Sequence, residues 1–328
     1  MQPALRPQAP RRRVLVLTLG VFALLASAAP VGAVEPIDSS DPVPVFRRRP
    51  PPEPTEAPTP SPAASPAPSP TPTPSVARAL DPSAPGYDVS WPQCGDPLPE
   101  AISFAIVGVN GGRVYSPNPC LGIGEDDSQL EWAGPQADLY LNTGNPGPDR
   151  SGYWPLGQAA QLECDTAASP GADTADCAYL YGWNAAADSY RIALEAFIGL
   201  GWAEPDADRV PGERTWWLDV EVANTWRLDW SLNVAMLQGA VDYLESMEVS
   251  EVGFYSTPLL WWQVTGGTDA FADYPAWHGG ASDQAEADEW CAADSFTGGE
   301  IRIVQWIENG LDHNYRCPPA PDSLRASP

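Results

Sequence analysis

The chain has 328 residues and a formal net charge of −26 at neutral pH, and it contains no lysine. Residues 1–84 carry a net charge of +2, whereas residues 85–328 hold nine arginines against 37 aspartates and glutamates, a net charge of −28. So acidic a region excludes nucleic-acid binding through phosphate contacts, because those contacts need basic side chains.

Residues 1–33 have the pattern of a secretory signal peptide. Arg6 and Arg11–Arg13 precede an apolar run from Val14 to Ala29, and Val31-Gly32-Ala33 supplies small residues for cleavage. An apolar run of this length is marginal for a membrane span, which needs about 20 residues. Membrane contact is therefore expected only if this segment stays uncleaved as an anchor. We expect an extracellular protein, either secreted or associated with the cell wall.

Residues 34–84 form a linker rich in Pro, Ser and Thr. Proline accounts for 16 of these 51 residues, so the segment cannot bury apolar surface and is expected to be disordered and extended. At about 3.1 Å per residue it can reach on the order of 160 Å. We expect a spacer before a folded domain at 85–320, followed by a tail at 321–328.

All six cysteines lie in the predicted domain. An even number in an exported chain indicates disulfides, although six cysteines allow 15 pairings. We expect nearest neighbours to pair: Cys94–Cys120, Cys164–Cys177 and Cys291–Cys317. Zinc is the alternative, and it is disfavoured because there is no CxxC motif and only two histidines. We expect no metal, no cofactor and a monomer.

Buried, non-alternating apolar segments alternate with helical patterns through the domain. Strands are predicted at 86–90, 103–109, 138–142, 215–222, 251–256, 274–278 and 301–306, and helices at 126–132, 178–200, 231–247 (N-cap Ser231) and 257–264. Residues 148–176 are predicted to be an irregular insert, and 281–300 an acidic loop. Strands interleaved with helices predict a parallel α/β barrel, whose functional residues lie at the carboxyl ends of its strands.

The predicted strand at 215–222 carries two carboxylates near its end, Asp219 and Glu221. Residues two apart in a strand point to the same face, so both side chains are expected to project together. Two neighbouring buried acids favour one that keeps its proton beside one that is ionised, which is the arrangement that glycoside hydrolysis uses. The alternative is a strand end at which two acids simply meet solvent.

Four motifs resemble those of family-25 glycoside hydrolases, the lysozyme-type muramidases of bacteria and phage. Gly86-Tyr87-Asp88-Val89-Ser90 is similar to their opening strand, and Leu218-Asp219-Val220-Glu221 to their Asp-x-Glu strand. Val252–Ser256 resembles the next strand. Val304-Gln305-Trp306 followed by Asp312-His313-Asn314 resembles the closing strand and its Asp-x-Asn. The motifs follow in order through residues 86–317.

The resemblance implies an irregular TIM-like α/β barrel with fewer helices than strands. It also implies cleavage of the β-1,4 bond between N-acetylmuramic acid and N-acetylglucosamine in peptidoglycan. Glu221 would then be the general acid, and Asp219 would orient the substrate's N-acetyl group or stabilise the cationic transition state. Asp88 would position substrate and tune Glu221, and Asp312 would support the site.

Four further residues are candidates for substrate binding. Trp277 and Trp306, near predicted strand ends, are candidates for stacking on sugars. Tyr255 can reach the groove or belong to the core, and Gln305 is the fourth candidate. The family has a further carboxylate near its late strands, for which Glu308 is a loose match. A second hypothesis is a non-catalytic domain that binds cell-wall glycan on the same scaffold.

Overall fold

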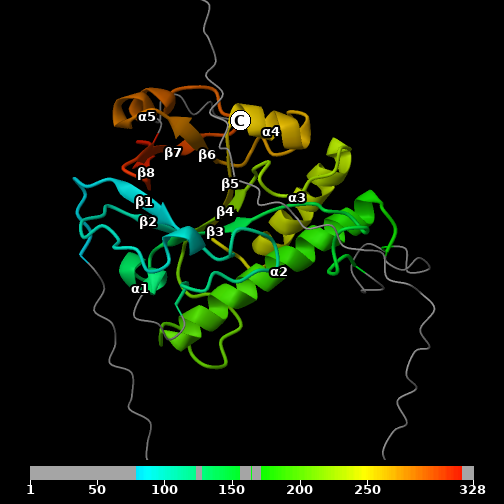
Figure 1. Cartoon of the computed structure of the whole chain (residues 1–328), viewed down its shortest axis with the longest axis horizontal. Helices are drawn as coiled ribbons and strands as arrows, with labels where there is room; N and C mark the ends of the chain where they lie inside the picture. Colours follow the sequence, from blue (N-terminus) through cyan, green and yellow to red (C-terminus); the bar gives the residue numbers. More distant parts are fainter. Residues whose placement is uncertain (1–78, 123–127, 156–163, 165–170, 320–328) are drawn as a thin grey trace, which may run out of the picture. The chain divides into compact units, whose positions relative to one another are not determined.

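The computed structural model describes residues 79–122, 128–155, 164 and 171–319 (Figure 1). The predicted signal peptide, the tail at 321–328 and all but the last residues of the linker lie outside the described residues. Within the described part, none of the helices has both the length and the apolar character that crossing a membrane requires.

The described part of the chain forms a closed barrel of eight strands in sequence order. Neighbouring strands are parallel except for the last, which runs antiparallel to both of its neighbours. The strands are β1 (Gly86–Val89), β2 (Ala105–Gly108), β3 (Asp138–Asn142), β4 (Thr215–Asp219), β5 (Glu251–Ser256), β6 (Ala276–Ala281), β7 (Ile301–Glu308) and β8 (Leu311–Arg316). The expectation of a wholly parallel barrel is therefore wrong at its closing strand.

Helices are fewer than strands in the described residues, as expected for an irregular barrel. They are α1 (Gln129–Ala133), α2 (Ala175–Gly199), α3 (Trp230–Ser246), α4 (Pro258–Thr265) and α5 (Gln284–Trp290), with a short 3₁₀ helix at Trp91–Gln93. The α5 helix occupies part of the region predicted to be an acidic loop, and Asp283 caps it by accepting hydrogen bonds from two of its first backbone N–H groups. The α3 helix is capped by Asp229 rather than by Ser231.

The strand that carries Asp219 is shorter than predicted. β4 ends at Asp219, and Glu221 lies in the turn that follows. Val220 keeps a strand-like contact, since its backbone N–H donates to the carbonyl of Tyr255 at 2.9 Å, and its side chain is fully buried. The β-branched valines at 220 and 222 continue the strand pattern, but the ladder with β5 ends earlier.

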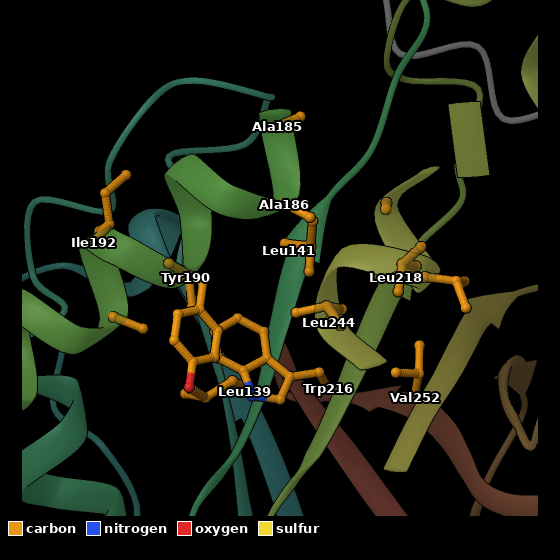
Figure 2. Packing of buried hydrophobic residues seen from close by; sticks show 14 of the residues in the cluster. Leu139, Leu141, Ala185, Ala186, Tyr190, Ile192, Trp216, Leu218, Leu244 and Val252 are labelled. Carbon is orange, nitrogen blue, oxygen red and sulfur yellow. The ribbon is translucent and has the colours of Figure 1, made fainter. Parts of the chain in front are cut away.

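Helices α2 and α3 lie side by side against the outer face of the barrel (Figure 1). Figure 2 shows Leu139 and Trp216, from neighbouring strands, packed with Tyr190 of α2, whose ring stacks on Trp216 at 5.3 Å. The two helices touch backbone to backbone, because a Cβ at Gly182 would collide with the carbonyl of Met236. The largest hydrophobic core therefore lies under this helix pair.

The barrel interior is filled by aromatic side chains rather than by aliphatic layers alone. Ile106, Trp217, Trp277 and Ile303 form its buried centre, with Tyr140 and Tyr255 packed around them. Glycines on neighbouring strands make room for these rings, and a side chain at Gly253 would collide with Trp217. The interior is packed below the site and opens at the carboxyl ends of the strands.

Three disulfides join the cysteines as expected. The pairs are Cys94–Cys120, Cys164–Cys177 and Cys291–Cys317. The second pins the irregular insert to the first turn of α2, and the third ties the end of α5 to the residue after β8. Disulfides of this kind are typical of proteins that fold in an oxidising compartment.

Candidate active site

A cavity of about 400 Å³ opens at the carboxyl ends of the parallel strands. Four carboxylates line it: Asp88, Asp219, Glu221 and Asp312. Asp312 reaches this end of the barrel because β8 is antiparallel, so that the beginning of β8 lies opposite Asp88 of β1. The antiparallel strand β8 thus adds Asp312 to the three acids that lie on β1, on β4 and in the turn after β4.

Register places the polar residues of the cavity at one level on consecutive strands. Asn142 pairs with Asp219, Asp219 with Tyr255, and Tyr255 with Trp277. Neighbours in register on parallel strands point to the same side, here toward the cavity. Glu221 lines the same cavity from the turn, whereas Val220 between the two acids packs into the core.

Asp88 is held by two amides. Gln305 Nε2 and Asn314 Nδ2 both donate to Asp88 Oδ1, at 2.8 and 2.6 Å. Burial raises the pKa of Asp88 to about 8, and the nearby Asp312 carboxylate adds to that rise. The two amide hydrogen bonds oppose the shift but do not cancel it, so Asp88 holds a proton at neutral pH.

Asp219 has one paired and one unpaired oxygen. Asn142 donates a hydrogen bond to its Oδ2, while Oδ1 is buried without a hydrogen-bond partner. Its backbone is fixed as well, since Thr143 donates to the carbonyl of Asp219 through both its N–H and its hydroxyl. Burial first, and the charge of Glu221 second, raise the pKa of Asp219 well above its ordinary value. Asp219 therefore lines the cavity as a buried acid with one oxygen that is not hydrogen-bonded.

Glu221 and Asp312 are the more accessible acids of the four, each half-buried. Burial raises the pKa of Glu221, and the charge of Asp312 raises it further. Burial also raises the pKa of Asp312. The turn that carries Glu221 is held in place by Trp226, whose indole N–H donates to the Glu221 carbonyl at 2.7 Å.

No arginine makes an ion pair with any of the four acids in the described part of the chain. Buried acids without cations lower their cost by keeping protons, so the cluster stores protons at pH values where exposed acids are ionised. A group of this kind can donate a proton to a leaving oxygen while its ionised neighbours stabilise a developing positive charge. The described residues contain no cluster of ligands able to hold a metal ion.

Three of the four residues predicted to bind substrate line the cavity: Tyr255, Trp277 and Gln305. The Tyr255 hydroxyl donates to Gln305 Oε1 at 2.8 Å, and Trp277 Nε1–H donates to Asn314 Oδ1 at 2.8 Å. Trp277 is only 2% exposed, so it forms the floor of the cavity.

Trp306 does not line the cavity, which corrects the expectation that it stacks on sugars there. Its ring is buried 5.2 Å from that of His313, and it borders a different hollow with residues such as Phe104 and Asn314. It neighbours Gln305 along β7, and successive side chains of a strand face opposite sides, so only one of the two can reach the site. Glu308 does not line the cavity either; it accepts a hydrogen bond from the Trp306 indole and is exposed.

Two asparagines were not among the predicted site residues. Asn314 donates to Asp88 and accepts from Trp277, and Asn142 donates to Asp219. Each carries a detectable pattern: Asn142 is a polar residue ending an apolar strand, and Asn314 follows the Asn309-Gly310 dipeptide, which is typical of a hairpin turn. Both asparagines therefore hold a carboxylate of the cavity in place by a hydrogen bond.

Neither a protein-family model nor a curated protein matches the sequence. Among solved structures the chain is similar to a muramidase from Acremonium alcalophilum (16% identity, TM-score 0.43, covering 72% of this chain and 95% of that one). It is also similar to a muramidase from Trichobolus zukalii (14%, 0.39, 73% and 95%) and to the bacterial lysozyme from Streptomyces coelicolor (14%, 0.39, 72% and 93%). At this level of similarity, the chemistry of this chain has to be argued from the residues of its own cavity.

Proposed function

We propose that the chain is a secreted peptidoglycan hydrolase that cleaves the β-1,4 bond between N-acetylmuramic acid and N-acetylglucosamine. The observation that carries this proposal is the set of four acids without cationic partners in one open cavity. Glycoside hydrolysis needs a protonated carboxyl and a nearby negative charge. Burial favours the protonated carboxyl, and an ionised neighbour among the four acids supplies the charge. The three disulfides agree with a protein that works outside the cell.

Glu221 is assigned the role of general acid. It is the more accessible member of the Asp219–Glu221 pair, and burial raises its pKa, which favours the protonated form that the reaction uses. As the bond between the sugar C1 and the bridging oxygen breaks, that oxygen takes the proton from Glu221. A water molecule then adds to C1 and returns a proton to Glu221, which restores the starting state.

Asp219 is assigned to the positive charge that develops at C1, acting directly or by orienting the substrate's own acetamido group. The residue lines the cavity beside Glu221, and Asn142 fixes its Oδ2. Asp312 acts through the electrostatic field of the cavity, since its charge contributes to the raised pKa of Glu221. Asp88, held by Gln305 and Asn314, positions the substrate. Tyr255, Gln305 and Trp277 form the wall and floor against which the sugar binds.

The test is the release of reducing ends from purified peptidoglycan by Glu221→Gln. We expect a loss of about 10²- to 10⁴-fold, because a general acid contributes that much to the rate. The matched control is Glu204→Gln, an exposed glutamate remote from the cavity, which should keep full activity. Unchanged turnover in a folded Glu221→Gln protein would refute the assignment.

Binding without turnover by the unaltered protein would favour the second hypothesis, a glycan-binding domain on the same scaffold. The measurement is sedimentation with insoluble peptidoglycan after long incubation, combined with a reducing-end assay of the supernatant. The hydrolase proposal requires soluble fragments to appear in that supernatant.

A further inference from the structure

Arginine is scarce in the described residues, and nearly every arginine there has a partner. Five make ion pairs with carboxylates, and the buried Arg214 donates to backbone carbonyls. The two arginines that are exposed and have no carboxylate partner within the described part are Arg113 and Arg150. In a domain with this excess of acids, an arginine that stays unpaired is available to an external anion.

Arg113 and Arg150 line the same hollow, of about 520 Å³. They come from different parts of the chain, Arg113 from the loop after β2 and Arg150 from the beginning of the insert after β3. Among the described residues, no aspartate or glutamate lines this hollow. Asp149 precedes Arg150 in the sequence but does not line it. The hollow therefore offers positive charge without an internal anion.

This hollow adjoins the candidate active site. Ala223 and Asn224 line both cavities, and Gly112 of the active-site cavity precedes Arg113 of the hollow. The shared wall is the turn that carries Glu221, since the N–H of Asn224 donates to the Glu221 carbonyl at 3.4 Å. A ligand cleaved at Glu221 would pass along this turn to reach the two arginines.

An aromatic pair forms another wall of the hollow. Tyr153 is 60% exposed, and its ring stacks on that of Tyr115 with centroids 4.2 Å apart and planes 10° apart. Tyr115 in turn meets the edge of Tyr181 at 5.6 Å, and Ser151 Oγ accepts the N–H of Tyr153 at 3.1 Å. An exposed ring fixed in this way offers a flat apolar face beside the two guanidinium groups.

We propose that this hollow binds the carboxylates that peptidoglycan carries on its muramic acid, while the adjoining cavity holds the bond to be cleaved. The inference rests on the proposed function and specifies which glycan that site prefers. Guanidinium groups bind carboxylates through paired N–H donors, and Tyr153 contacts the apolar part of the same substituent. In peptide-bearing strands the lactyl carboxyl is consumed in the amide bond to the peptide, so the carboxylate there belongs to the peptide. In stripped strands it is the free lactyl group.

The test compares three soluble substrates: glycan strands with their peptides, strands stripped of peptides, and uncharged N-acetylglucosamine oligomers. In the full chain, Arg113→Gln combined with Arg150→Gln should lower kcat/KM for the peptide-bearing strands about three- to tenfold, as expected for two exposed ion pairs. Cleavage or binding of the uncharged oligomers should not change. The effect should vanish near 1 M salt, where the Debye length falls to about 3 Å.

Two controls accompany the double variant. Arg209→Gln removes an exposed arginine that pairs with Glu248 and lines neither cavity, so it should not change the preference among substrates. The double variant Arg113→Lys with Arg150→Lys should keep most of the preference, because the charge remains. A loss on the stripped strands identifies the lactyl carboxylate, whereas a loss confined to the peptide-bearing strands identifies the peptide.

Equal effects of the double glutamine variant on charged and uncharged glycans would overturn the proposal, as would binding that follows a phosphate-bearing wall polymer instead. If the unaltered chain cleaves none of the substrates, the proposed hydrolase fails, but this hollow is still tested by equilibrium binding. Peptide-bearing strands should then bind the unaltered chain more tightly than the double variant, and equal affinities would overturn the inference independently.

Discussion

The two ends of the barrel treat buried acids in opposite ways. At the amino end of the parallel strands, Asp138 forms an ion pair with Arg316 at 3.0 Å. Arg302 forms ion pairs with Glu251 at 3.3 Å and with Glu300 at 2.9 Å. At the carboxyl end, four acids line a cavity that no arginine borders. In such barrels the amino end usually contributes to stability, and the carboxyl end carries the chemistry.

Burial alone does not separate the two ends. It raises the pKa of Asp138 as well, but Arg316 and the Thr215 backbone N–H act in the opposite direction. At the cavity the neighbouring charges are negative and add to the effect of burial on Asp88, Asp219 and Glu221. What distinguishes the ends is the sign of the neighbouring charge, which stabilises ionised acids at one end and protonated acids at the other.

Among the variants that test the contrast between the two ends, the largest effect is expected for Asp219→Asn. The substitution removes the carboxyl group assigned to the positive charge that develops at C1, so turnover of peptidoglycan should fall by about 10²- to 10³-fold, the usual cost of losing a preorganised electrostatic group. Thermal stability should be equal or higher, because the change removes a buried oxygen whose charge has no partner. Exposed Asp206→Asn is the control for both assays, and a strongly destabilised Asp219→Asn would contradict the contrast between the ends.

The next effect concerns pH. The pKa of Asp88 is about 8 in the folded chain and about 3.9 in an unfolded one, so the stability present below pH 4 should decline as pH rises toward 8. Because one proton changes stability by about 1.4 kcal/mol per pH unit, we expect a decline on the order of 3 kcal/mol between pH 5 and pH 8, measured as urea midpoints.

Asp88→Asn should flatten this dependence, since an amide oxygen can accept the same bonds from Gln305 and Asn314. A decline that persists unchanged in that variant would mean that another acid is responsible.

A smaller effect is expected at the opposite end of the barrel. Asp138→Asn should destabilise the fold by about 1 kcal/mol, because Arg316 is half exposed and such pairs contribute little. Activity at moderate temperature should be unchanged. Adding Arg316→Gln should cost little more, which a double-mutant cycle from thermal unfolding would measure. Loss of activity in a folded Asp138→Asn protein would show that the two ends are not independent.

Much of the barrel could be predicted from the sequence, because its inner strands are continuous apolar runs. The strands at 138–142 and 251–256 have the predicted bounds, and the helix at 258–265 begins after Thr257 as its cap and Pro258 imply. The disulfide pairs also follow the expected pairing. These features depend on local composition or on neighbours close in sequence.

The closing strand was not predictable from apolar pattern. β8 carries Asp312, His313 and Asn314, and buried polar residues of this kind lack the alternation that identifies a strand. Its position depends on pairing with β1, which lies more than 200 residues earlier in the chain. The local signal for the hairpin is the Asn309-Gly310 dipeptide, in which both residues have positive φ. Trp306 was misplaced for a related reason, since its side of β7 depends on where that strand lies in the closed barrel.

Because β8 is antiparallel to β1, the start of β1 and the end of β8 lie at the same end of the barrel. β1 begins at Gly86 and β8 runs toward its end at Arg316 beside it, as the pairing of Gly86 with Asn314 shows. Both strands therefore leave the barrel on the side remote from the acids. A tether joined to either end would attach to the side of the domain opposite the cavity. The mouth of the cavity would then stay accessible to a strand of a large, insoluble polymer.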